Sequence, residues 1–250
     1  MSVVTVVTGG GSGIGAALCR RVAGPGARLV LHTGSQRERA EAVAARLREN
    51  GAEVEVVVAS FDDPARAGSV VEAAVTRWGR VDRIVHAAGF ADRRKFGEID
   101  GVGFERSLSA NAGAFFHLAT AALPNLKQSP APRVVAVSSF LAHSLRLGPD
   151  MLFPASTASK AALEGLVRSL AMQLATERIP VNCVVPGFIA KERGTPSALD
   201  DAARARVETL VPFGRYGQPD EVAAAIEYLL GPGGAYITGQ MLHVDGGLTL

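Results

Sequence analysis

Cysteine and metal-binding patterns are nearly absent from this sequence of 250 residues. It contains two cysteines, Cys19 and Cys183, which stand far apart and lack the spacing of metal ligands. The five histidines form no H-x-x-x-H or H-E-x-x-H pattern, so we expect no metal site. We interpret the cysteines as buried thiols of a protein in the reducing cytoplasm.

Strong charge of one sign and long hydrophobic runs are also missing. The formal net charge is +2, and basic residues are interspersed with acidic ones, which argues against a nucleic-acid partner. The densest basic stretch, Arg93-Arg94-Lys95, indicates either a solvated loop or an anion site. No apolar run has membrane length, and the first residues enter a strand without a basic leader, so we expect no membrane partner.

Short apolar runs alternate with longer helical patterns along the chain. The expected strands are 3–8, 27–33, 54–59, 82–87, 133–138, 181–185 and 239–244. The expected helices are 13–23, 36–50, 64–78, 104–127, 156–177 and 219–230. The strands are continuously apolar, as strands covered on both faces are, so the pattern predicts an α/β fold with a parallel sheet. No linker or repeat divides the chain, and we expect a single domain.

A glycine-rich turn near the N-terminus carries the first functional signal. Thr8-Gly9-Gly10-Gly11-Ser12-Gly13-Ile14-Gly15 directly follows an apolar run over 3–7. Glycines let the backbone turn tightly and let a pyrophosphate approach without meeting a Cβ atom. The helix that follows points its N–H groups and the positive end of its dipole at the anion. The sequence therefore predicts a dinucleotide site.

The longest irregular segment is 188–216, which is rich in glycine, proline and charge. A loop of this length in an α/β domain is typical of a lid or binding loop, and we expect one short helix in it near 198–209. Ligands of open parallel sheets lie at the carboxyl ends of the strands, so residues that end strands are the site candidates.

Further motifs follow the glycine turn in order and at familiar spacing: His86-Ala87-Ala88-Gly89, Asn111, Ser138-Ser139, Lys160, Pro186-Gly187 and Asp245-Gly246-Gly247. With them the chain resembles the short-chain dehydrogenase/reductase family over essentially its whole length, and most of all the ketoacyl-carrier-protein-reductase type. The resemblance implies a Rossmann-type, doubly wound sheet of seven parallel strands, a nicotinamide dinucleotide cofactor, a small-molecule substrate and a homotetramer.

The resemblance also implies which residues bind the cofactor. They are Gly9, Ile14, Gly15, Ala87, Ala88, Gly89, Lys160, Pro186, Gly187 and Ile189, joined by Ser12 and Gly13 of the same turn. Ser60, with Phe61 beside it, stands where the family usually has an aspartate that reaches the adenine.

The turn after the second strand favours NADP(H) over NAD(H). It reads Leu31-His32-Thr33-Gly34-Ser35-Gln36-Arg37, with no carboxylate to repel a 2′-phosphate. Thr33, Ser35 and Arg37 could donate to that phosphate, although Ser35 is also explained as a helix cap and Arg37 as a solvated side chain. Ser12 weakens the preference, because relatives that use NADP often have a basic residue in the glycine turn.

The family's catalytic Tyr-x-x-x-Lys motif reads Ser156-Thr157-Ala158-Ser159-Lys160, so a serine occupies the tyrosine position. The resemblance places the catalytic serine at Ser139 and the asparagine at Asn111. Carbonyl reduction needs a proton for the alkoxide, and a phenol beside an ammonium supplies it near neutral pH. A serine hydroxyl is a far weaker acid and is shorter by about a ring, so Ser156 could at best hold a relay water.

No other phenol matches this position, because the three tyrosines are Tyr216, Tyr228 and Tyr236. The segment between Ser139 and Ser156 is longer than usual and contains His143, which is either an acid or a solvent-facing loop residue. Lys191 replaces the threonine that would bind the nicotinamide carboxamide, and the run 191–193 either favours an anionic substrate or is solvated.

Three functions remain open at this point. The first is an NADP(H)-dependent reductase or dehydrogenase with an atypical site, the second a nucleotide-binding protein without turnover, and the third a non-redox dehydratase or isomerase. Two helices carry small-residue faces, which serve either assembly or the core: Ala110, Ala112, Gly113 and Ala114, and Ala158, Ala161, Ala162 and Gly165. Apolar residues near the site suit either a substrate wall or core packing: Phe140, Leu141, Met151, Leu152, Phe153 and Phe188.

Overall fold

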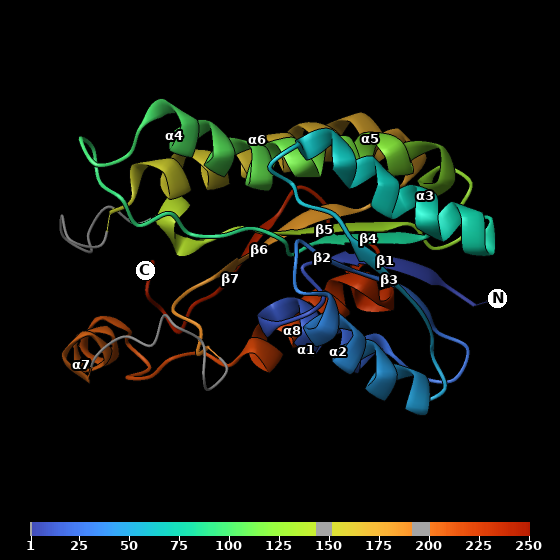
Figure 1. Ribbon diagram of the computed structural model, residues 1–250, viewed down its shortest axis with the longest axis horizontal. Helices are drawn as coiled ribbons and strands as arrows, with labels where there is room; N and C mark the ends of the chain where they lie inside the picture. The colour runs from blue at the N-terminus through green and yellow to red at the C-terminus, as the bar shows by residue number, and fades with distance from the viewer. Residues whose placement is uncertain (1, 144–151, 192–200) are drawn as a thin grey trace.

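Seven parallel strands form the centre of the molecule (Figure 1), in a computed structural model that describes residues 2–143, 152–191 and 201–250. The strands are β1 (Val4–Thr8), β2 (Arg28–Thr33), β3 (Glu53–Val58), β4 (Arg83–His86), β5 (Arg133–Val137), β6 (Val181–Pro186) and β7 (Met241–Val244). Their order in the sheet is β3-β2-β1-β4-β5-β6-β7. The order reverses direction between β1 and β4, which is where doubly wound sheets open a crevice for ligands. The predicted Rossmann-type architecture is confirmed.

Helices cover both faces of the sheet (Figure 1). One face carries α1 (Gly13–Val22), α2 (Arg37–Glu49) and α8 (Pro219–Leu230). The other carries α3 (Ala67–Trp78), α4 (Gly101–Leu108), α5 (Ala114–Leu126) and α6 (Pro154–Leu174). The short helix α7 (Asp201–Leu210) lies apart from both layers, beyond the strand ends, close to the range predicted for it.

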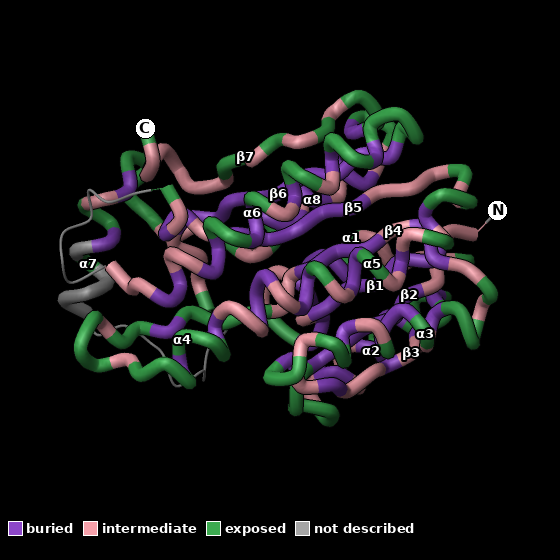
Figure 2. Tube along the Cα trace, turned by 90° about the horizontal axis from the view of Figure 1, so that it is seen from above, coloured by how far each residue is buried: buried purple, intermediate pink, exposed green. Residues whose placement is uncertain are grey.

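Continuous apolar strands explain the two buried layers. In β1, Val4 and Val6 pack into the core under α3, α5 and α6, whereas Val7 packs into the core under α1, α2 and α8. Both faces of the inner strands are therefore dry, as Figure 2 shows by their colour. The edge strand β7 differs, because Leu242 and His243 are exposed.

Two of the predicted helices are not regular α-helix throughout. The helix expected over 64–78 begins as a 3-10 turn, Pro64–Arg66, in which Asp63 accepts from the N–H of Ala65 at 3.1 Å, and α3 follows. The helix expected over 104–127 starts earlier, at Gly101, because Asp100 caps it by accepting from the N–H of Gly103 at 2.8 Å. A π-helical turn, Ser109–Gly113, then separates α4 from α5.

The two ends of the expected lid are paired with each other. Ile189 forms a parallel bridge with Gly217, and the N–H of Ala190 donates to the carbonyl of Gly217 at 2.8 Å. Residues 192–200 of the predicted lid lie outside the described residues. None of the helices that the structure describes combines the length and apolar character of a membrane span.

Candidate active site

The glycine turn after β1 adopts a conformation that only glycine takes readily. Gly9 and Gly13 have φ angles of 69° and 52°, in the left-handed region. A Cβ atom on Gly9 would lie 2.8 Å from the backbone nitrogen of Ala88, so the turn packs directly on the end of β4. Ser12 makes no side-chain capping bond to α1, which leaves the first N–H groups of this helix for an anion.

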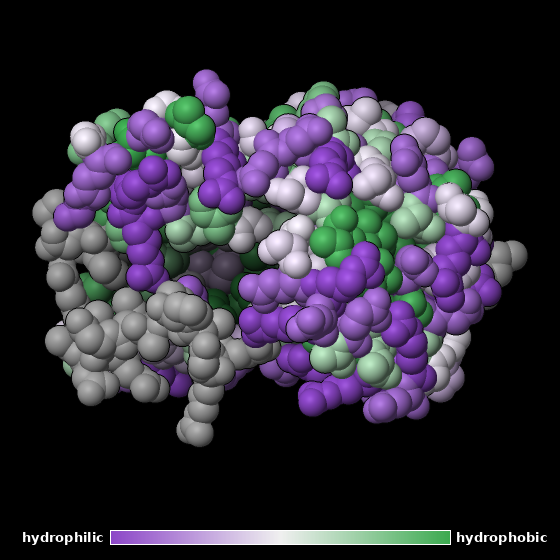
Figure 3. All heavy atoms as spheres, viewed as in Figure 1, coloured by the Kyte–Doolittle hydropathy of each residue, from purple (hydrophilic) through white to green (hydrophobic). Residues whose placement is uncertain are grey.

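A cleft of about 950 Å³ opens at the carboxyl ends of the strands, and Figure 3 shows this face of the molecule hollowed. Most of the predicted cofactor residues line it: Gly9, Ser12, Gly13, Ile14, Gly15, Thr33, Ser35, Ser60, Phe61, Ala87, Ala88, Gly89 and Ile189. Its size, its glycine cradle and its position at the switch point fit a dinucleotide.

Pro186 and Gly187 do not line this cleft. Pro186 ends β6, and a Cβ atom on Gly187 would lie 2.8 Å from the Cα atom of Asp245. Gly187 thus lets the chain leave β6 in contact with the segment after β7. Pro186 and Gly187 thus affect the cleft indirectly, because they set the direction of the segment that brings Ile189 into it.

Two rings under the cleft were missed by the sequence analysis. His32 and Phe61 stack with ring centroids 4.2 Å apart and planes 8° from parallel, and both line the cleft. Burial lowers the pKa of His32 to about 4, so the ring is neutral, and its Nε2 lies 2.8 Å from the carbonyl of Ala59. His32 directly precedes the predicted Thr33, so its place at a strand end was a usable signal.

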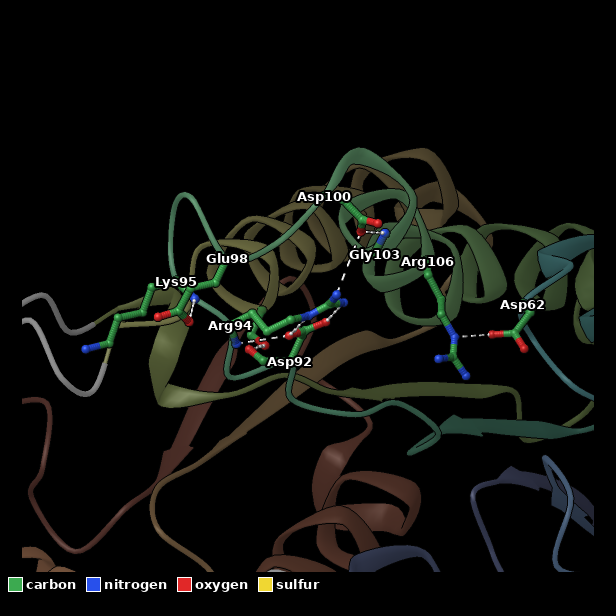
Figure 4. A network of polar contacts seen from close by, with 9 residues as sticks. Asp62, Asp92, Arg94, Lys95, Glu98, Asp100, Gly103 and Arg106 are labelled. Atoms are coloured by element: carbon green, nitrogen blue, oxygen red, sulfur yellow. Dashed lines mark hydrogen bonds and ion pairs between the residues drawn. The ribbon is translucent and has the colours of Figure 1, made fainter.

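Ser60 is joined to a charged pair rather than standing alone. Its hydroxyl donates to Asp62 at 3.0 Å, and Asp62 also accepts from Arg106 at 2.6 Å, as Figure 4 shows for the pair. The hydrogen bonds from Arg106 and Ser60 lower the pKa of Asp62. Asp62 and Arg106 both line the cleft. A carboxylate whose negative charge is balanced by Arg106 therefore borders the region where the resemblance places the adenine.

The basic residue that faces the cleft after β2 is Arg39, not the predicted Arg37. Gln36, not Ser35, occupies the N-cap position of α2, and Arg37 is the first residue of the helix. Arg37 lies 3.9 Å from Glu41 on the next turn, with 63% of its side chain exposed. Arg39 lies two residues further, on a different side of the helix, and lines the cleft.

Lys160 and Asn111 approach the end of the cleft at Gly89. The Nζ atom of Lys160 donates to the carbonyl of Val137 at 2.9 Å. A Cβ atom on Gly89 would lie 3.3 Å from this Nζ and would overlap Oδ1 of Asn111. This Oδ1 is buried and has no hydrogen-bond partner among the described residues, whereas Nδ2 donates to Ser107 and Ser159. An unsatisfied acceptor thus lies close to an ammonium group beside the cleft.

The electrostatic setting of Lys160 matches that of a proton donor. Burial lowers its pKa from 10.5 to about 8, against the opposing effect of Glu164 one helical turn away. The thiol of Cys183 lies near enough to interact, but its own burial raises its pKa to about 12 and keeps it neutral. Lys160 therefore carries its proton at neutral pH and releases it close to the physiological range.

Ser139 lies at the start of a short turn after β5. It is the N-cap of the 3-10 turn Phe140–Ala142, where its Oγ accepts from the N–H of Leu141 at 3.3 Å. A hydroxyl that accepts from the backbone keeps its own proton for another acceptor. This geometry suits the predicted role of polarising a carbonyl.

Ser156 makes a structural contact with the loop after β4. Its hydroxyl is buried and donates to the main-chain carbonyl of Asp92 at 3.0 Å. Asp92 in turn binds Arg94 through both carboxylate oxygens, and Arg94 also lies 3.7 Å from Asp100 (Figure 4). The basic run 93–95 thus includes a residue that braces this loop internally, and Ser156 ties the loop to α6.

His143, an exposed residue, contacts a buried polar pair of Ser138 and Glu164 that the sequence analysis did not foresee. Its Nε2 lies 2.8 Å from Oε1 of Glu164, and 23% of its side chain is exposed. The hydroxyl of Ser138 donates to the same oxygen at 2.5 Å. His143 therefore has a side-chain partner on α6, and like Ser139 and Lys160 it does not line the cleft itself. Within the described chain, no group of three or more His, Cys, Asp or Glu side chains could hold a metal ion.

The apolar residues near the site pack mainly on each other. Phe140 and Leu141 are buried together, and Phe153, Phe188, Leu210 and Leu248 pack against them. Phe140 and Phe188 have ring centroids 4.5 Å apart. Core packing therefore accounts for most of the predicted substrate wall, while Met151 lies outside the described residues. Lys191 lines the cleft, and partial burial together with the charge of Arg93 lowers its pKa.

Comparison with known proteins agrees with this geometry. Residues 9–249 match the family model described as enoyl-(acyl carrier protein) reductase. The chain is 33% identical to the short-chain dehydrogenase/reductase FrzI of Cladobotryum sp, over 97% of this chain and 94% of that protein. It is 32% identical to the 3-oxoacyl-[acyl-carrier-protein] reductase FabG of Aggregatibacter actinomycetemcomitans, over 99% and 100% of the two chains.

A solved structure shares the whole architecture. The blue fluorescent protein from a metagenomic library, in complex with NADPH, superposes with a TM-score of 0.89 at 32% identity, covering 99% of this chain and 98% of that one. The fold, the motif order and these likenesses lead to one conclusion: this chain belongs to the short-chain dehydrogenase/reductase family.

Proposed function

We propose that this protein is an NADP(H)-dependent oxidoreductase that interconverts a carbonyl and a hydroxyl group on a small molecule, with a serine where the family has its catalytic tyrosine. The observation that carries the proposal is the convergence of Lys160, Asn111 and the glycine-lined cleft at Gly89. NADPH in a related solved structure supports the cofactor assignment.

The cleft residues support NADP(H) over NAD(H). The wall that follows β2 contains Thr33, Gly34, Ser35, Gln36 and Arg39 and no carboxylate. Hydroxyls and a guanidinium are donors suited to a 2′-phosphate. The carboxylate that follows β3, Asp62, is held by Arg106.

The proposed chemistry divides between Ser139 and Lys160. The bound cofactor supplies the hydride. Ser139 donates its hydroxyl proton as a hydrogen bond to the substrate carbonyl, and Lys160 gives a proton to the alkoxide oxygen through a water held by its Nζ and Oδ1 of Asn111. The products are an alcohol and oxidised cofactor, and Lys160 regains its proton from solvent. Ser156 takes no part in proton transfer, because its hydroxyl is bound to Asp92.

A nucleotide-binding protein without turnover is the second candidate, and the same Ser156 contact favours it. Positioned general acids typically contribute about 10²- to 10⁴-fold in rate, and this site has no phenol beside Lys160 among the described residues. A non-redox dehydratase or isomerase remains the third reading, although no described feature speaks for it specifically.

Two measurements separate these candidates. Thermal unfolding with NADPH and with NADH tests binding, because a ligand that binds only the folded state raises its stability. Oxidation of NADPH, followed by absorbance against a panel of ketones and aldehydes, then tests turnover. We expect stabilisation that is larger with NADPH, together with slow turnover; binding without turnover on any carbonyl contradicts the enzymatic proposal.

We also propose a homotetramer in the cytoplasm. Ala161, Ala162 and Gly165 of α6 are exposed, as is Phe116 of α5, which leaves a face suited to close packing with another copy. The small residues Ala110, Ala112 and Ala114, by contrast, are buried within the chain. Cys19 and Cys183 are buried free thiols, which fits a reducing compartment. That 188–216 acts as a lid over the single domain stays a prediction.

A further inference from the structure

One buried carboxylate contacts both ends of the turn that carries Ser139. The hydroxyl of Ser138 donates to Oε1 of Glu164 at 2.5 Å, and Nε2 of His143 lies 2.8 Å from the same oxygen. Ser138 immediately precedes Ser139, and His143 immediately follows the 3-10 turn Phe140–Ala142. Glu164 therefore bridges the first and last residues of the segment 138–143.

Glu164 is placed for this contact by α6. It lies one helical turn after Lys160, on the same side of the helix, and its side chain is 4% exposed. Lys160 binds the carbonyl of Val137 while Glu164 binds the hydroxyl of Ser138, so two successive turns of α6 hold two successive residues of the chain at the end of β5. A further charged neighbour among the described residues is Arg168, whose Nη2 lies 3.8 Å from Oε2 of Glu164.

We propose that Glu164 is a positioning residue for Ser139, and that the Ser138–Glu164–His143 bridge fixes the direction in which the Ser139 hydroxyl points. The proposal rests on the proposed function, in which Ser139 polarises the substrate carbonyl. The Ser139 hydroxyl accepts from the N–H of Leu141 at 3.3 Å, and its carbonyl accepts from the N–H of Ala142 at 3.1 Å. Both contacts lie within the turn, so the anchoring of the turn determines where the hydroxyl points. Displacement of a positioned group by about 1 Å can cost about 100-fold in rate.

The bridge also fixes the tautomer of His143. An ionised carboxylate only accepts hydrogen bonds, so the imidazole must carry its proton on Nε2 when it is neutral. The ring of His143 also contacts the ring of His243 edge-on, with the two ring centroids 4.6 Å apart. The Nδ1 of His243 lies 2.9 Å from the hydroxyl of Thr249 and 3.7 Å from Asp245. The tautomer of His143 is thus a readout of the bridge that needs no turnover.

The decisive experiment combines changes at Glu164 with loss of Ser139. E164L removes the acceptor at similar size, whereas the amide oxygen of E164Q can still accept from Ser138 and His143. We expect E164L to lower kcat for carbonyl reduction by roughly 10- to 100-fold with little change in KM for NADPH, and E164Q to stay within about 3-fold of the parent. In an S139A background, E164L should lower kcat further by less than about 2-fold, because the two residues act as one unit.

Other outcomes contradict the proposal. If E164L costs the same factor with and without Ser139, Glu164 does not act through that residue. If E164Q loses as much as E164L, the charge near Lys160 matters rather than the bridge. Should E164L fail to fold, H143L breaks one arm of the bridge at its more exposed end; we expect a loss of about 3- to 10-fold that is again absent in S139A.

A spectroscopic arm separates this proposal from the proposed function. Long-range ¹H–¹⁵N spectra of the histidine rings should show His143 as the Nε2–H tautomer in the parent and in E164Q, and as a mixture in E164L. If the parent shows this signature but reduces no carbonyl, the oxidoreductase assignment fails while the bridge stands. If the parent shows the Nδ1–H form, the bridge is refuted whatever the activity.

Discussion

The hydroxyl of Ser156 donates to the main-chain carbonyl of Asp92 across 3.0 Å, and the two residues are 64 positions apart in the sequence. This hydrogen bond joins the start of α6 to the loop after β4 at the place where the family's phenol would stand. Ser156 therefore braces this loop against the start of α6.

Restoring the phenol should restore the acid. We expect S156Y to raise the rate of carbonyl reduction at least about tenfold, because a phenol beside the Lys160 ammonium is a positioned general acid. The ring must displace the Asp92 carbonyl, so the variant should also unfold at a lower temperature than the parent. S156F is the matched control: it makes the same steric change without a hydroxyl and should gain no activity. Equal rates for S156Y and S156F would show that the site has diverged beyond this side chain.

Arg39 should select the phosphorylated cofactor. Because it lines the cleft after β2, we expect R39A to weaken NADPH binding by about tenfold and to leave NADH binding unchanged. R37A provides the control, since Arg37 is largely exposed beside Glu41 and should affect neither cofactor. Titration of protein fluorescence with each nucleotide measures both constants. A loss that is equal for NADPH and NADH would place Arg39 away from the 2′-phosphate.

The pH dependence of reduction should report Lys160. Burial lowers its pKa to about 8, so the ammonium that donates the proton is present below that pH and is lost above it. We therefore expect kcat for reduction to be level between pH 6 and about 7.5 and to fall towards tenfold per pH unit above about pH 8. NADPH binding, measured in parallel, controls for loss of cofactor. A rate that stays level to pH 9.5 would exclude Lys160 as the donor.

Asp82 should be a major contributor to stability at the start of β1. Its side chain is 1% exposed and accepts from the N–H of Val4, from Arg80 and from the hydroxyl of Ser129. We expect D82N to lower the free energy of unfolding by about 2–4 kcal/mol in urea denaturation, because donors to the buried carboxylate lose their acceptor. D220N, which removes a surface pair with Arg21, should cost less than about 1 kcal/mol.

Acid should remove the same contribution. Burial raises the pKa of Asp82, but the hydrogen bonds from Arg80, Ser129 and Val4 outweigh it, and the net pKa lies below the ordinary value of 3.8. The folded protein therefore binds this proton less readily than the unfolded chain does. The contribution is complete above about pH 5, and it declines as the pH falls through the ordinary range of aspartate towards the lower folded pKa. The difference in stability between the parent and D82N should shrink over that interval.

Local sequence was sufficient to predict the elements of the fold. The apolar runs that end at Thr8 and His86 mark β1 and β4, and the glycine turn marks the cradle, because period, caps and turn chemistry are properties of neighbouring residues. The π-helical turn around Asn111 was not predictable in this way, since small residues such as those of Ser109–Gly113 fit regular α-helix equally well.

The misses at the site have specific causes. The choice between Arg37 and Arg39 depends on which residue begins α2, and helix boundaries are uncertain by a residue or two. The contact of Ser156 with Asp92 joins segments that are distant in the sequence, so no pattern of neighbouring residues indicates it. Glu164, in contrast, was available: it follows Lys160 by four residues on a predicted helix, and a buried acid at that spacing could have been inferred.

The π-helical turn Ser109–Gly113 determines how this helix tolerates changes in length. A π turn accommodates an inserted residue within a helix that would otherwise wind regularly. Deleting a single residue ahead of Asn111 would let α4 and α5 fuse into one continuous rod. Regular winding through this turn would change the position and direction of the side chain at Asn111, and the amide would no longer meet Lys160 at Gly89. The extra residue in this π turn therefore determines the direction of the Asn111 amide.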